Sequence, residues 1–275
     1  MDNAQVDLGQ LKKVQIEILK EFLEVCGKLK LRYYLLGGTL LGAVRHQGFI
    51  PWDDDIDVGM PRQDYEIFLK EGQKLLPEHL FIQSIQTEPE YLMCFGKIRN
   101  SNTTFVESSI SKRKINHGVY IDIFPLDYCP GNPKERTRVN QKKRMYDRRI
   151  LIAFLPFYKQ PLLSALKSVA LFCRFPSVKR VLLKREQLYK SIPESDLIAN
   201  YGGAWGEKEI VPKDWYGEGT ELTFEGIPVM APKEYDKWLT QVYGNYMQLP
   251  PEEKRVGHHY TEVIDLEKPY TEYCK

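Results

Sequence analysis

The sequence has 275 residues, of which 43% are hydrophobic and 28% charged, and its formal net charge is +2. This balance excludes a disordered protein, allows a substantial buried core, and argues against nucleic-acid binding by the molecule as a whole. Five cysteines without a CxxC pair, an N-terminus unlike a signal peptide, and no apolar run long enough to cross a membrane together lead us to expect a cytoplasmic protein.

The first predicted elements are a helix, a strand and a glycine turn. Apolar side chains recur at helical spacing over residues 8–29, and the short apolar run 33–36 predicts a buried strand. Gly37, Gly38 and Thr39 follow at the transition from this strand to a second helix. Glycines allow close approach of the backbone, and a helix N-terminus offers free N–H groups to phosphate. These three residues are therefore candidate phosphate-binding residues.

The acidic segment DDDIDVGM predicts a second strand over residues 53–60. Because side chains alternate in a strand, Asp53, Asp55 and Asp57 are expected on one face. Carboxylates so close repel one another, and a divalent cation such as Mg²⁺ would remove that cost. An acidic surface turn is the alternative interpretation. An EF-hand loop is excluded, because Val58 stands where that loop requires glycine.

Further elements follow, with a third acid among them. Residues 62–75 have helical spacing, and strand-like runs follow at 80–85, 91–99 and 118–124. Strands mixed with helices predict an α/β (α+β) core in the first half of the chain. Asp122 stands among apolar residues of the last strand. A carboxylate in such surroundings needs a partner, and a metal ion shared with the earlier acids would supply one.

Basic side chains accompany these motifs, each of them a candidate phosphate contact or an ordinary surface charge. Arg45 and His46 lie between the glycine turn and the acidic segment. Lys97 and Arg99 alternate on a predicted strand. His258, near the end of the chain, is a further substrate-binding candidate. Arginine and lysine at such positions suit a diphosphate.

The second half of the chain contains a strongly basic stretch. Between Arg136 and Arg185 there are 14 lysines and arginines and one acid, Asp147. Basic residues beside aliphatic ones are typical of a helix lying on an anionic membrane. The alternative is a basic helical hairpin that packs on the core and has a solvated face. We therefore expect a basic amphipathic helical insertion over residues 136–190, in peripheral contact with an anionic membrane or with solvent.

Nine aromatic residues lie between positions 201 and 246. Most of them are expected in the core, but aromatic faces also bind quaternary ammonium groups such as choline. Trp205, within the glycine-rich segment GGAWG, is the first candidate for such a contact.

The motifs together resemble one known family. GGTLLGAVRHQGFIPWDDDIDVGM, followed by GVYIDIFPLD, is similar to the LicD family of phosphotransferases, which includes bacterial phosphocholine transferases and is related to fukutin-type enzymes. The resemblance runs from about residue 30 to about residue 260. It implies a nucleotidyltransferase fold, with a mixed sheet and flanking helices in a single domain over 1–275, and a bound Mg²⁺, with Mn²⁺ as the alternative.

The resemblance also implies roles for particular residues. Asp55, Asp57 and Asp122 carry over as metal ligands and catalytic carboxylates, and the glycine turn as the phosphate-binding segment. The implied reaction moves a phospho-substituent, phosphocholine first, from a CDP-linked donor such as CDP-choline to a sugar hydroxyl of a cell-surface glycan or teichoic acid precursor, and releases CMP. The same carboxylates also suit a conventional nucleotidyltransferase that releases pyrophosphate. A non-catalytic metal- or glycan-binding module is the other alternative. The acceptor would be lipid-linked if the basic stretch binds the inner face of the plasma membrane.

Overall fold

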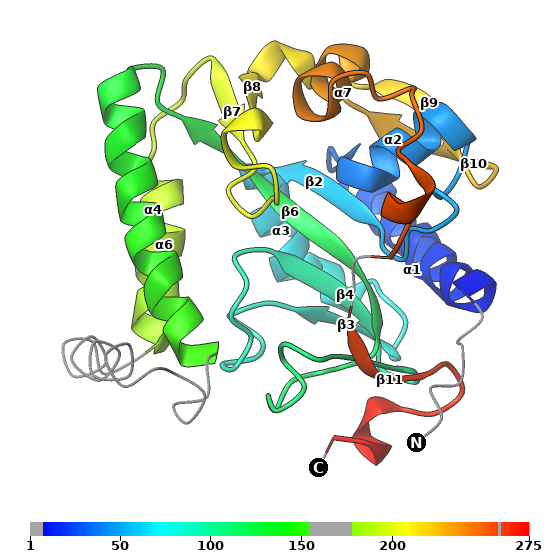
Figure 1. The fold of residues 1–275 in the computed structure, drawn as a ribbon. Helices are drawn as coiled ribbons and strands as arrows, with labels where there is room; N and C mark the ends of the chain where they lie inside the picture. The colour runs from blue at the N-terminus through cyan, green and yellow to red at the C-terminus, as the bar shows by residue number, and fades with distance from the viewer. Residues whose placement is uncertain (1–7, 155–177, 258–259, 275) are drawn as a thin grey trace.

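A mixed sheet forms the centre of the computed structural model, which describes residues 8–154, 178–257 and 260–274 (Figure 1). Its main path runs β1–β2–β6–β4–β3. β2 and β6 are parallel, and the other neighbours on this path are antiparallel. The bounds are β1 (Tyr34–Leu35), β2 (Asp57–Pro61), β3 (Leu80–Gln83), β4 (Gly96–Asn100) and β6 (Val119–Cys129). The expected α/β character is confirmed.

Two helices, α1 (Leu8–Leu29) and α3 (Arg62–Glu71), cover one face of the sheet (Figure 1). The periodic apolar face of α1 is buried, with Ile18 and Phe22 almost inaccessible to solvent. A 3₁₀ turn, η1 (Gly72–Lys74), continues α3, so both early helix predictions are confirmed. Alternation along β6 then places Asp122 on the face opposite to its neighbours Ile121 and Ile123.

The second strand is shorter than expected, because β2 begins only at Asp57. Residues 51–56 form a turn and an irregular segment instead. Side chains of α1 hold this segment: Lys12 donates to the carbonyls of residues 50 and 51, and Gln15 to that of residue 54, at 2.8–3.1 Å. The prediction of a regular alternation from Asp53 was therefore wrong. The run predicted at 91–99 is likewise strand only from Gly96, as β4.

Two long helices occupy one side of the sheet (left in Figure 1). α4 (Pro133–Phe154) and α6 (Val178–Lys190) pack against each other through Ile150, Val181 and Leu182. Both described stretches of the predicted basic insertion are thus helical. The apolar residues Leu155 to Phe172, on which the membrane interpretation partly rested, lie outside the described residues. In the part of the chain that the structure describes, no helix is both long and apolar enough to span a bilayer.

The remaining elements close the fold around the upper end of the sheet. β7 (Leu197–Ala199) extends the sheet from the end of β6 and pairs with β8 (Ile210–Pro212). Between and after them come η3 (Gly206–Glu209), η4 (Lys213–Trp215), the hairpin β9 (Thr220–Phe224) and β10 (Ile227–Ala231), and α7 (Tyr235–Tyr243).

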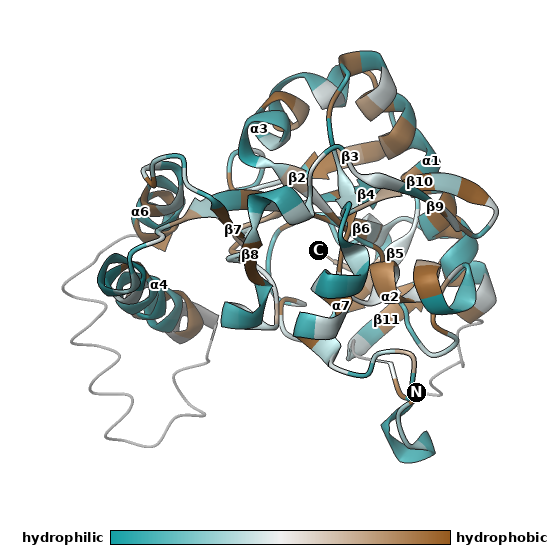
Figure 2. Ribbon diagram, turned by 90° about the horizontal axis from the view of Figure 1, so that it is seen from above, coloured by the Kyte–Doolittle hydropathy of each residue, from teal (hydrophilic) through white to brown (hydrophobic). Residues whose placement is uncertain are grey.

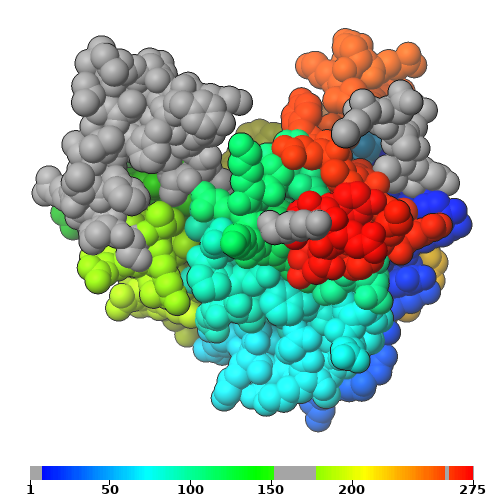
Figure 3. Space-filling view, turned by 90° about the horizontal axis from the view of Figure 1, so that it is seen from below, coloured from blue at the N-terminus to red at the C-terminus, as the bar shows by residue number. Residues whose placement is uncertain are grey.

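A strand near the end of the chain pairs with a strand from the first half. η5 (Glu252–Lys254) precedes β11 (Thr261–Asp265), which pairs with β5 (Thr104–Glu107), a strand that sequence patterns did not predict. The terminal residues, with η6 (Tyr270–Glu272), lie against this region in the view from below (Figure 3, red).

Candidate active site

A pocket of about 610 Å³ opens where the beginnings of α2 (Gly37–His46) and β2 meet β6. This volume is in the range of small-molecule and cofactor sites. One wall consists of the carboxylates Asp53, Asp55, Asp57 and Asp122. Much of the remaining lining comes from the segment after β7 and from the end of α7 and the residues that follow it, and includes the aromatic residues Trp205, Tyr243 and Tyr246.

The carboxylate wall is built from two strands and the irregular segment before one of them. Asp57 and Asp122 are register partners on the parallel strands β2 and β6, so their side chains share a face. Asp53 and Asp55 reach the same pocket from the segment before β2. Burial first, and then the negative charges of Asp55 and Asp122, raise the pKa of Asp57 well above its ordinary value. The sequence-predicted acids therefore converge, although not by the predicted alternation.

The glycine turn lies directly against these acids. Gly37 has φ +54°, in the left-handed region, and a Cβ atom there would lie 2.8 Å from Oδ2 of Asp57. At Gly38 a Cβ atom would collide with the carboxylate of Asp53. Both glycines line the pocket, as expected of a phosphate-binding turn. Thr39 instead is buried, and its hydroxyl accepts the backbone N–H of Asp57 at 2.8 Å, which fixes the start of β2.

The donor atoms in this wall fit a hard divalent cation. Asp53, Asp54 and Asp55 each offer a carboxylate oxygen within 4.8 Å of the other two. Asp55 also acts electrostatically on Asp57. Oxygen ligands are those that Mg²⁺ prefers, and positive charge among crowded carboxylates would reverse the raised pKa of Asp57. The choice of Asp55, Asp57 and Asp122 as the ligand set stays a prediction.

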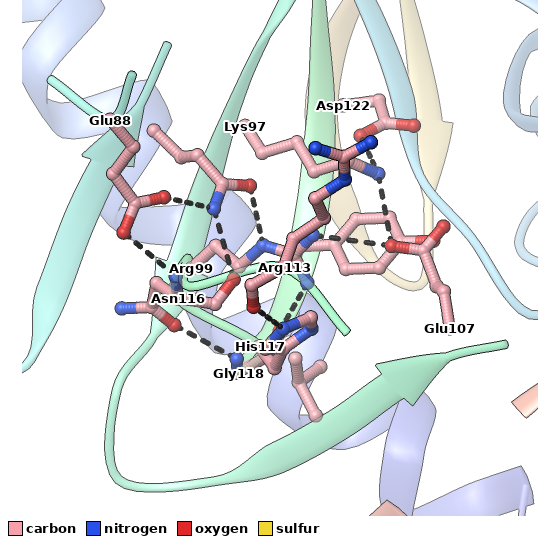
Figure 4. A network of polar contacts seen from close by, with 12 residues as sticks. Glu88, Lys97, Arg99, Glu107, Arg113, Asn116, His117, Gly118 and Asp122 are labelled. Atoms are coloured by element: carbon pink, nitrogen blue, oxygen red, sulfur yellow. Dashed lines mark hydrogen bonds and ion pairs between the residues drawn. The ribbon is translucent and has the colours of Figure 1, made fainter. Parts of the chain in front are cut away.

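Lys97 and Arg99 occupy a buried polar network beside the pocket, shown in Figure 4. Lys97 forms an ion pair with Asp122 at 2.8 Å and lies 3.3 Å above the ring of Tyr120. Arg99 is fully buried, donates to the carbonyl of Gly118 at 2.8 Å and pairs with Glu107 at 3.2 Å.

The structure gives both side chains partners within the protein, and their predicted contact with phosphate stays a prediction. Neither Lys97 nor Arg99 is among the described residues that line the pocket. The register of β4 on β6 sets Lys97 opposite Asp122 and Arg99 opposite Tyr120, so these four side chains share one face of the sheet. Lys97 therefore contacts the catalytic candidate Asp122.

The other basic candidates differ in their positions. Arg45 lines the pocket, and its Nη1 atom donates to the carbonyl of Tyr246 at 2.7 Å. Its Nε atom donates to His46, whose pKa is lowered by burial and by the charge of Arg45. His46 is not among the described residues that line the pocket. His258 lies outside the described residues, so its predicted role stays a prediction.

Two aromatic side chains form a further part of the lining, the aromatic wall. Trp205 and Tyr243 both line the pocket, with ring centroids 5.0 Å apart in an edge-to-face arrangement. Trp205 is 44% exposed, so it is available to a ligand. The buried carboxylate of Glu209 holds this wall, because it accepts the backbone N–H of Trp205 and the side-chain amide of Asn200, each at 2.9 Å. Burial raises the pKa of Glu209 to about 7.

Comparison with known proteins agrees with this geometry. Residues 30–162 match the model of a family described as LicD/FKTN/FKRP, nucleotidyltransferase domain. Over 273 aligned residues the chain is 32% identical to the lipopolysaccharide cholinephosphotransferase LicD of Haemophilus influenzae. The alignment covers 95% of this chain and 99% of that relative. The chain belongs to the LicD family.

Other relatives match only parts of the chain. The human ribitol 5-phosphate transferase FKRP is 58% identical over 33 residues, which is 12% of this chain and 7% of the relative. An uncharacterised protein of Rickettsia prowazekii is 34% identical over 115 residues, or 42% of this chain and 39% of the relative. The resemblance read from the motifs is thus confirmed.

Sequence reasoning missed several residues of this LicD-family site. Gln15 holds the acidic segment, and the signal was a polar residue within the apolar face of a predicted helix. Lys254 lines the pocket from η5. Tyr243 is one of the nine aromatic residues noted in the sequence, but nothing there singled it out, because its contact with Trp205 joins segments 38 positions apart. Glu209 carried no signal.

Proposed function

We propose that this LicD-family protein transfers a substituted phosphate, phosphocholine first, from a CDP-linked donor to a sugar hydroxyl of a cell-surface glycan or teichoic acid precursor. The observation that carries the proposal is the convergence of four carboxylates and a glycine turn in one pocket. Alignment over 99% of a protein named as a lipopolysaccharide cholinephosphotransferase supports this class of reaction. The partial match to a ribitol 5-phosphate transferase supports a substituted phosphate as the group transferred.

The proposed reaction is a single displacement at phosphorus. The acceptor hydroxyl attacks the phosphorus that bears the substituent, and the bond from this phosphorus to the bridging oxygen breaks. The electron pair leaves with CMP, and the hydroxyl proton passes to a carboxylate, for which Asp122 is our candidate. Lys97, 2.8 Å from Asp122 and almost fully buried, fixes the direction of that carboxylate.

Mg²⁺, or Mn²⁺ in its place, is the proposed cofactor, and Asp55, Asp57 and Asp122 would hold it. When bound, the ion would neutralise the diphosphate and stabilise the leaving phosphate. The chain itself supplies the remaining positive potential. The N-terminus of α2, at Gly37, and the side chains of Arg45 and Lys254 line the same pocket as the acids.

The aromatic wall is the proposed site of the choline headgroup. Trp205 and Tyr243 meet edge to face in the pocket lining, Trp205 is 44% exposed, and one cation of the chain, Lys208 Nζ, lies over its ring at 5.4 Å from the centroid. A quaternary ammonium group is attracted to such ring faces. This arrangement favours phosphocholine over an uncharged substituent.

The decisive experiment identifies the products. Incubation of the purified protein with CDP-choline, MgCl₂ and acceptor glycan is expected to release CMP only when the acceptor is present. A conventional nucleotidyltransferase would instead release pyrophosphate from CTP, and phosphocholine from CDP-choline. A non-catalytic binding module would turn over neither nucleotide. A panel of other CDP-linked donors, assayed in the same way, then identifies the preferred substituent.

A further inference from the structure

The outward face of α4 carries a row of exposed basic side chains. Lys134, Arg138, Lys142 and Arg148, the α4 basic row, recur at spacings that place them on one side of the helix. Met145, 39% exposed, lies within this row. The helix is mainly hydrophilic in Figure 2, with α6 alongside it.

The opposite side of α4 packs on the protein and contains paired charge. Asp147 forms ion pairs with Lys143 at 2.8 Å and with Arg185 of α6 at 3.2 Å. Ile150 is buried against α6. The acid that lies within the basic stretch is thus paired on the inner side, and Glu135 is the exposed acid of the helix. The outward face is therefore strongly positive.

The α4 helix adjoins the rim of the pocket. The side-chain amide of Asn140 donates to the carboxylate of Glu207 at 2.9 Å. Glu207 belongs to η3, two residues from Trp205 and from Glu209, which holds the aromatic wall. Asn140 lies on the other side of α4 from the basic row, so one helix diameter, about 10 Å, separates the row from this part of the pocket rim.

We propose that the α4 basic row docks the protein on an anionic bilayer surface beside the pocket. Lysines and arginines bind anionic headgroups, and exposed aliphatic side chains enter the boundary beneath them. Met145, 39% exposed, supplies such an apolar side chain within the row. A nucleic acid would bind through the basic side chains alone and would gain nothing from an exposed apolar side chain beside them. Docking of this kind presents the pocket to an acceptor carried in the membrane, which goes beyond the proposed reaction.

The test is sedimentation with vesicles of phosphatidylcholine alone and with about a third of phosphatidylglycerol. The wild type is expected to sediment only with the anionic vesicles, and less as salt rises. The triple variant Lys134→Glu, Arg138→Glu, Lys142→Glu should bind about 100-fold more weakly, because each basic residue near the surface contributes about 1 kcal/mol.

A matched variant controls for net charge. Lys13→Glu, Lys20→Glu, Lys70→Glu changes three exposed lysines of α1 and α3 by the same total charge and should bind like the wild type. Equal losses in both triple variants, or wild-type binding that ignores lipid charge, would overturn the proposal. So would binding to duplex DNA without binding to vesicles. CMP release from a soluble acceptor and the thermal midpoint should be unchanged in both variants, so vesicle binding is judged independently of the reaction.

Discussion

The strand β6 carries two buried acids whose surroundings differ. Asp127, at its far end, is 2% exposed and receives both arms of Arg62, at 2.7 and 2.6 Å. Arg62 also pairs with Glu186 at 2.6 Å, which ties β6 to α3 and α6. Asp122, five residues earlier, pairs with Lys97 through one oxygen and lines a pocket with three other aspartates.

The difference separates a structural carboxylate from a functional one on the same strand. A bidentate arginine satisfies both oxygens of Asp127 and encloses them in protein. Asp122 stands instead among like charges, an arrangement that costs stability unless a ligand or cation uses it. Burial and sequence context are similar for the two acids, so their partners decide their roles.

The largest expected effect comes from the pocket acids. Asp57→Asn or Asp122→Asn should lower kcat by about 10³-fold, because each removes charge that acts on the transition state. The unfolding midpoint should not fall in Asp57→Asn, since this change removes repulsion, whereas Asp122→Asn also removes the ion-pair partner of the buried Lys97 and should lower it. CMP release and thermal unfolding measure the two quantities. Full activity in either variant would remove that residue from the mechanism.

At the other end of β6, loss of the partner of Asp127 should lower stability and leave activity unchanged. Arg62→Met leaves Asp127 buried without its partner and is expected to lower the free energy of unfolding by about 3–5 kcal/mol. The kcat of the folded fraction should stay close to that of the wild type. Urea unfolding and active-site titration measure these quantities. A loss of kcat without a loss of stability would contradict the comparison.

The carboxyl group of Glu209, which holds the aromatic wall, should make the stability of the protein depend on pH. Its pKa is about 7 in the folded protein, against an ordinary value of 4.5, so the folded state binds the proton more tightly. The contribution of Glu209 to stability is therefore fully present below about pH 4.5, and about 3 kcal/mol of it is lost as the pH rises through 7. Glu209→Gln should remove this loss. Urea unfolding between pH 5 and 8 tests it, and identical slopes in both proteins would refute the assignment.

Lys97 should act through Asp122 rather than on the substrate. Lys97→Met is expected to lower kcat by about 10- to 100-fold, the usual effect of losing a residue that orients a ligand or catalytic group, with little change in KM. Lys97→Arg should restore much of the rate, because it preserves the ion pair. Steady-state kinetics with CDP-choline separate kcat from KM. A rise in KM alone would instead indicate direct contact with the donor.

The smallest effect is expected at the aromatic wall. Trp205→Ala should raise KM for CDP-choline about tenfold, the scale of one cation–π contact, while Trp205→Phe keeps most of the affinity. The KM for a CDP-linked donor without a cationic headgroup should change less. Equal changes for both donors would assign Trp205 to the nucleotide or to the acceptor.

Much of the carboxylate wall could be predicted from the sequence, because its residues lie within local motifs. The run after Trp52 and the strand around Asp122 signalled acids in a buried sheet, and the glycine turn marked the start of a helix. The shape of residues 51–56 could not be predicted, because α1 side chains set it across about 40 positions of sequence.

The parts of the site that sequence reasoning missed depend on register and on distant segments. The period of a strand showed that Lys97 and Arg99 share a face, but only the pairing of β4 with β6 puts Lys97 on Asp122. Glu209 gains its role from the fold of residues 200–205 around it. No spacing in the sequence encodes either contact.

A titration of Mn²⁺, followed by electron paramagnetic resonance, tests the central claim most directly, because it does not depend on turnover. We expect the wild type to bind Mn²⁺, more tightly in the presence of CDP-choline, and the variant Asp55→Asn, Asp57→Asn, Asp122→Asn to lose this binding while remaining folded. Binding of equal strength in wild type and variant, or no binding by the wild type, would contradict a cation held by these acids.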